Sequence, residues 1–64
     1  MSQEKQELLA RQVMNHIQSE NRHRGTLTQK QMEDTMIVKI SDTLDSAGVS
    51  NHRRFARSFV GKNL

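Results

Sequence analysis

The chain has 64 residues, a formal net charge of +3, 33% hydrophobic residues, and no cysteine or proline. This length predicts a single domain, residues 1–64, and the lack of cysteine excludes disulfides and thiolate metal sites. The apolar runs are too short for a signal peptide or a membrane span. We therefore expect a cytoplasmic protein without a membrane partner.

The first predicted helix covers about residues 3–23. Leu9, Val13 and Ile17 recur at every fourth position and give this helix one apolar face. Gly25 follows directly after the last turn, where a glycine commonly adopts the left-handed conformation that ends a helix. The pattern therefore predicts an amphipathic helix with a defined end.

The second predicted helix covers about residues 29–47. Thr28 and Gln31 have the spacing of a capping box, in which each side chain accepts a hydrogen bond from the other residue's backbone. Gly48 is expected to end the helix. The apolar stripe of this helix runs through Met32, Met36, Ile37, Ile40, Leu44 and Ala47.

The third predicted helix is short, about residues 51–60, with Ser50 as its cap and Gly61 as its stop. No segment has the alternation expected of a strand. Two long helices joined by a short connection predict an antiparallel helical hairpin. The predicted fold is all-α, with the third helix folded across one end of the hairpin.

The small core predicts association with another chain. A single core of this size rarely supplies more than about 3–5 kcal/mol of stability, and no disulfide or thiolate metal site is available to add to it. We expect a homodimer, or folding against a protein partner. The methionines, at the edges of the apolar stripes, suit an adaptable contact surface or gap-filling in the core. The predicted interface comprises Leu9, Val13, Ile17, Met36, Ile40 and Leu44.

The segment from Leu44 to Phe59 resembles a helix-turn-helix, because an Ala-Gly-Val-Ser turn separates two predicted helices. The resemblance covers about a quarter of the chain. Arg54 occupies a position that is usually apolar in that motif. An ordinary helical corner with a solvated basic face accounts for the same residues. As a nucleic-acid site, the second helix would present Asn51 to a base and Arg53, Arg54 and Arg57 to phosphates or guanine.

Arg22 and Arg24 form a second basic cluster at the end of the first helix. They are candidates for contacts to flanking phosphates, but favourable interaction with the helix dipole explains them equally well. The two clusters would support each other only if the third helix brought its arginines to the turn between the first two helices.

Metal and catalytic functions have little support in the sequence. His16, Glu20 and His23 have a spacing that can place three ligands on one helix face, but a fourth ligand is missing. The chain has too few apolar residues to wall a catalytic pocket. We expect no enzyme activity, metal, cofactor or small-molecule substrate.

Two functions remain as hypotheses. The first is a small nucleic-acid-binding regulator of phage, plasmid or bacterial type, with DNA favoured over RNA. Asp42 and Asp45 count against it, because they lie beside the proposed recognition helix and would repel phosphate. The second is a protein-interaction module, an inhibitor or adaptor whose helical hairpin docks on a larger partner.

Overall fold

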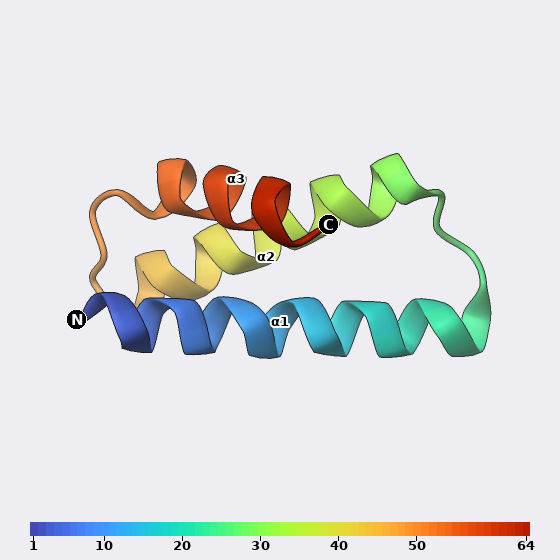
Figure 1. Ribbon diagram of the computed structural model, residues 1–64, viewed down its shortest axis with the longest axis horizontal. Helices are drawn as coiled ribbons and strands as arrows, with labels where there is room; N and C mark the ends of the chain where they lie inside the picture. Colours follow the sequence, from blue (N-terminus) through green and yellow to red (C-terminus); the bar gives the residue numbers. More distant parts are fainter.

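Three α-helices make up the computed structural model, which describes residues 1–64: α1 (Gln3–Arg24), α2 (Gln29–Ser46) and α3 (His52–Asn63). The helices α1 and α2 run antiparallel, and α3 returns along α2 on one side of this hairpin (Figure 1). The molecule measures 33 × 19 × 16 Å. The predicted all-helical class and the hairpin with a short third helix are confirmed. The third helix lies along α2, however, and not across one end of the hairpin as predicted.

The ends of α1 and the start of α2 follow the local sequence signals. The Ser2 hydroxyl accepts a hydrogen bond from the Lys5 amide at 3.2 Å and caps α1. Gly25 ends α1 in the left-handed conformation, at φ 62°. The capping box of α2 is complete: the Gln31 amide donates to Thr28 Oγ1 at 3.2 Å, and the Thr28 amide donates to Gln31 Oε1 at 3.0 Å.

Asn21 also organises the turn between α1 and α2, which the sequence analysis did not predict. Its Oδ1 accepts a hydrogen bond from the Leu27 amide at 2.9 Å, and its Nδ2 lies 3.6 Å from the Met32 sulfur. Its backbone carbonyl also accepts the Gly25 amide. One side chain of α1 therefore holds both the connection and the first turn of α2.

A glycine turn directs the chain from α2 into α3. Gly48 has φ 85°, and its amide donates to the Asp45 carbonyl at 3.0 Å. The Val49 amide donates to the Leu44 carbonyl at 2.9 Å. This pair of bonds is a Schellman motif, and it places the Val49 side chain in the core. The predicted helix end at Gly48 is confirmed.

The predicted limits of α3 were wrong at both ends. Asn51, rather than Ser50, is the N-cap residue, and its side chain makes no capping hydrogen bond. Gly61 does not stop the helix, which continues to Asn63. A glycine in a helix interior costs only about 1 kcal/mol relative to alanine, so adjacent packing can override it. Here the preceding Val60 is fully buried, and its carbonyl accepts the Leu64 amide at 3.0 Å.

The core is formed by all three helices. Met36, Ile40 and Leu44, three of the residues of the predicted interface, are completely buried in it by the chain's own helices. Ile17 is also buried, at 8% exposure. Met14 and Met36 lie within the core rather than at the edges of the stripes. The buried hydrophobic residues are Ala10, Met14, Ile17, Met36, Ile40, Leu44, Val49, Ala56, Phe59 and Val60.

Phe59 links α3 to α1. Its ring stacks on Phe55, with centroids 5.7 Å apart, and the Arg11 guanidinium of α1 lies 5.6 Å from its centroid. A cation in this position is attracted by the negative face of the ring. Burial of Phe59 and Val60 towards the hairpin leaves the opposite face of α3 in solvent.

Candidate nucleic-acid interface

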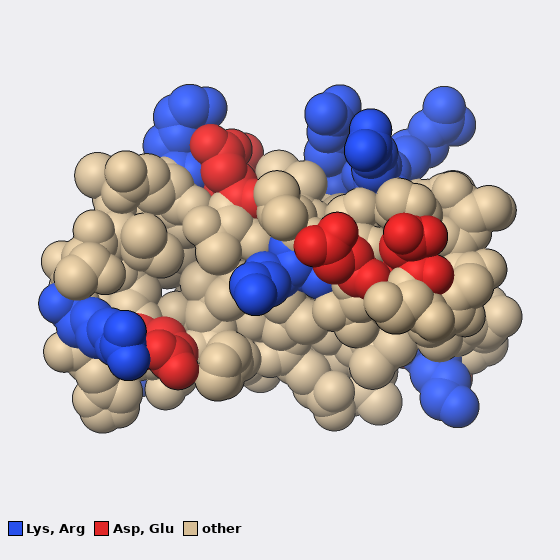
Figure 2. Space-filling view, turned by 180° about the vertical axis from the view of Figure 1, so that it is seen from behind, with Lys and Arg blue, Asp and Glu red and all other residues tan.

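The solvent-facing side of α3 carries three arginines. Arg53, Arg54 and Arg57 are exposed, whereas Ala56 and Val60 point into the core. Basic side chains stand out from the molecule above the first half of α3 (Figure 2). None of the three guanidinium groups lies within 4.0 Å of a carboxylate, since the ion pairs of the chain involve other residues. Their charge is therefore not neutralised by a close ion pair within the chain.

The start of α3 adds unpaired backbone donors to this face. Asn51 contributes no side-chain acceptor, and no acidic residue lies in the first turn. The first intrahelical bond is that from the Phe55 amide to the Asn51 carbonyl. The preceding amides at the helix N-terminus have no protein acceptor, and such amides favour an anion. Asn51 itself is exposed, with its amide free to bind.

Two carboxylates of α2 limit how a polyanion can approach. Asp42 lines a hollow of about 260 Å³ with Arg53 and Arg57, although it pairs with neither. Asp45 lines a second hollow, of about 490 Å³, beside Asn51 and Arg53. Figure 2 shows acidic side chains below the basic group. An anion would meet repulsion on the α2 side and attraction on the outer side of α3.

A polar bridge that the sequence analysis missed fixes the start of α3 on α2. The Ser41 hydroxyl and His52 Nδ1 lie 2.6 Å apart, and His52 Nε2 lies 3.6 Å from Asp45 Oδ1. The carboxylate favours a proton on Nε2, so that the hydroxyl donates to Nδ1. The one available signal was the position of Ser41 within the apolar stripe, between Ile40 and Leu44, where a buried hydroxyl requires a partner.

This serine, histidine and aspartate do not have the layout of a hydrolytic triad. Ser41 is only 7% exposed, whereas the Asp45 side chain is 70% exposed. A nucleophile must face the substrate, with its carboxylate partner shielded behind the histidine. The order of burial is reversed here, which suits a connection between two helices.

The second basic cluster lies at the opposite end of the molecule. Arg22 and Arg24 end α1 at the turn into α2, while α3 begins at the other end of the hairpin (Figure 1). Arg24 Nε lies 3.8 Å from Glu20 Oε2, and His16 Nε2 lies 3.6 Å from Glu20 Oε1. The two clusters therefore lie at opposite ends of the hairpin and do not form one continuous basic surface.

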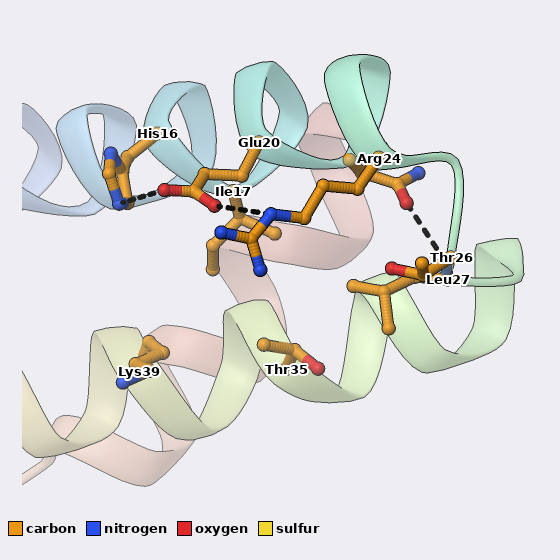
Figure 3. A pocket seen from close by; sticks show the side chains of 9 residues that line it. His16, Ile17, Glu20, Arg24, Thr26, Leu27, Thr35 and Lys39 are labelled. Carbon is orange, nitrogen blue, oxygen red and sulfur yellow. Dashed lines mark hydrogen bonds and ion pairs between the residues drawn. The ribbon is translucent and has the colours of Figure 1, made fainter.

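The remaining predicted contact residues border a groove between α1 and α2. Leu9 and Val13 are half-buried there, and Ile17 lies at its floor (Figure 3).

The histidines and carboxylates of the chain form no cluster of three that could hold a metal. None of the helices has the length and apolarity needed to cross a membrane. The chain matches no family model, no curated protein and no solved structure.

Proposed function

We propose that this protein is a non-catalytic regulatory protein that binds nucleic acid, with DNA preferred, through the outer face of α3. The observation that carries the proposal is the group of unpaired guanidiniums of Arg53, Arg54 and Arg57 on one exposed helix face. Arginine forms paired, charge-assisted hydrogen bonds with phosphate oxygens. A basic face without internal carboxylate partners is available for such contacts.

The local cost of these charges supports the same function. Cations in the first turn of a helix interact unfavourably with its dipole, by about 0.3–1 kcal/mol each. Arg53 and Arg54 both lie in the first turn of α3. Phosphate bound there would meet the guanidiniums and the free backbone amides together, so the unfavourable placement would become favourable on binding.

Contact with the phosphate backbone accounts for the site better than deep insertion into a groove of DNA. Asp42 and Asp45 flank α3 on its α2 side and would meet the phosphates of an inserted duplex. Phosphate contacts give affinity that is independent of sequence. In this proposal Asn51 supplies any base contact, and Arg22 and Arg24, at the other end of the hairpin, are not part of the α3 site.

The proposal is tested by fluorescence anisotropy with random-sequence duplex DNA. Three phosphate contacts predict a slope of log affinity against log salt of about −2.7, or about a 40-fold loss of affinity between about 50 and 200 mM salt. The double variant Arg53→Ala/Arg57→Ala should reduce the slope to about −0.9. Lys30→Ala/Lys62→Ala removes the same charge elsewhere and should leave the slope near the wild-type value. Absence of wild-type binding at about 50 mM salt would exclude the proposal.

A second candidate function is a protein-interaction module. The observation that favours it is the groove between α1 and α2, about 330 Å³ near Glu20 and Arg24, with Ile17 at its base. Its test is capture of partners from a nuclease-treated lysate, with Val13→Lys as the groove variant. Loss of every captured protein after nuclease treatment would count against this function and support nucleic-acid binding.

A further inference from the structure

The hairpin of α1 and α2 has two sides, and α3 covers only one of them. On the open side lies the groove of about 330 Å³ shown in Figure 3, where the ribbon of α3 passes behind it. A second hollow of about 350 Å³ contains Leu9 and Val13. Because both hollows are lined by His16, Ile17 and Lys39, they form one continuous groove.

One stripe of α1 borders this groove along most of its length. Lys5, Leu9, Val13, His16 and Glu20 follow one another at spacings of three or four residues, which places them on the same side of a helix. Leu9 and Val13, at the centre of the stripe, are only half-buried. The stripe therefore has an incompletely covered apolar middle between a cationic and an anionic end.

The chain exposes more surface than a typical folded monomer of its mass. The accessible surface is 4711 Å², compared with about 4,200 Å² for a typical folded monomer of 7.4 kDa. A standard interface buries about 800 Å² per partner, which is about one-sixth of this surface.

The charges at the two ends of the stripe favour a second copy of this chain as the molecule that covers the groove. Glu20 follows Lys5 by 15 positions, or about 22 Å along the helix. In an antiparallel pair of α1 helices, each Lys5 would face the partner's Glu20, and this contact would occur twice. A parallel pair would instead place like charges together. Lys5 has no carboxylate within 4.0 Å in its own chain, whereas Glu20 already lies 3.6 Å from His16 Nε2 and 3.8 Å from Arg24 Nε. These pairs of Glu20 are exposed and therefore weak, so they leave its carboxylate open to a partner's Lys5.

We propose that the open side of the hairpin binds a second copy of this chain, with the two α1 helices antiparallel about a two-fold axis near Gln12 and Val13. This pairing buries Leu9 and Val13 and gives each Lys5 a carboxylate partner. Because each α3 lies on the far side of its own hairpin, both arginine faces remain in solvent. The proposal does not depend on nucleic-acid binding and is tested without nucleic acid.

Charge reversal tests the pairing. Lys5→Glu or Glu20→Lys alone replaces two attractions by two repulsions and should raise the dimer dissociation constant about tenfold, measured by analytical ultracentrifugation. The double variant Lys5→Glu/Glu20→Lys should restore wild-type affinity. Lys5→Glu suits the dipole at the start of α1, whereas Glu20→Lys also breaks the pairs of Glu20 with His16 and Arg24. Circular dichroism of each variant therefore checks that α1 remains folded. Lys62→Glu carries the same charge change off the stripe and should leave the constant within about twofold.

Cross-linking tests the direction of the helices, because the natural chain has no cysteine. A mixture of Lys5→Cys and Glu20→Cys chains should form a disulfide between the two variants on mild oxidation. Lys5→Cys alone should remain uncross-linked. Cross-linking of Lys5→Cys with itself would indicate parallel helices and overturn the proposal. A folded monomer at about 200 μM, with helicity confirmed by circular dichroism, would also overturn it and assign the groove to a different partner.

Discussion

The two arginine clusters have similar compositions but opposite electrostatic settings. Arg22 and Arg24 end α1, where the helix dipole favours cations, and Arg24 also lies 3.8 Å from Glu20. Arg53 and Arg54 begin α3, where the dipole disfavours cations, and neither has a carboxylate partner. Folding alone explains the first cluster. The second cluster interacts unfavourably with the dipole of α3, and no contact within the chain offsets this effect. It is therefore the better candidate for binding.

The largest expected effect on stability comes from truncating Phe59, which packs the helix of the second cluster, α3, against the hairpin. Phe59→Ala should destabilise the protein by about 3–5 kcal/mol, because Phe59 packs in the core and joins α3 to α1. This loss is as large as the stability expected of a core of this size, so the variant should be mostly unfolded even without urea. Urea unfolding followed by circular dichroism measures this loss. The exposed Leu8→Ala is the control and should change stability by less than about 0.5 kcal/mol. A loss below about 1 kcal/mol for Phe59→Ala would show that α3 is held by other contacts.

A glycine follows each arginine cluster in the sequence. Replacing the two glycines by alanine should change the stability of the protein in opposite directions. Gly25 has φ 62°, so Gly25→Ala should destabilise by about 1–2 kcal/mol. Gly61 is helical, and an added methyl group would meet open space, so Gly61→Ala should stabilise by about 0.5–1 kcal/mol. Thermal unfolding of both variants provides the comparison. Destabilisation by Gly61→Ala would contradict the extension of α3 to Asn63.

The smallest expected effect tests the dipole argument directly. Arg22→Gln/Arg24→Gln should lower stability, and Arg53→Gln/Arg54→Gln should raise it, each by about 0.3–1 kcal/mol per residue at low salt. The same change in net charge makes each variant the control for the other. Both effects should shrink at about 1 M salt, where exposed charges are screened. Shifts of the same sign in urea unfolding would show that net charge, rather than position along the helix, governs stability.

Local sequence signals were sufficient for most helix boundaries. The capping box of Thr28 and Gln31 and the turns at Gly25 and Gly48 depend on residues within one or two helical turns of each other, and all are present. The end of α3 was not predictable in this way. Gly61 permits either a stop or a continuation, and burial of Val60 against other helices favours continuation.

The candidate site was predictable only as a list of exposed arginines. Its relation to Arg22 depends on the direction in which α3 returns along α2, which local patterns do not specify. The bridge from Ser41 to His52 joins residues 11 positions apart and forms only when two helices pack. Likewise, the stripe of Ile40 and Leu44 indicated burial without indicating whether the covering chain was the same or another.

The bridge between Ser41 and His52 also acts with the burial of Ala56, Phe59 and Val60 to set the rotation of α3 about its own axis. A helix turns by 100° per residue, so the short contact at His52 sets the direction of every later side chain. Arg53 and Arg57 differ by 400°, or one full turn and 40°, and therefore project within a narrow sector. The hydroxyl of a single serine thus adds a directional contact to the apolar packing that keeps these two arginines on the solvent side of α3.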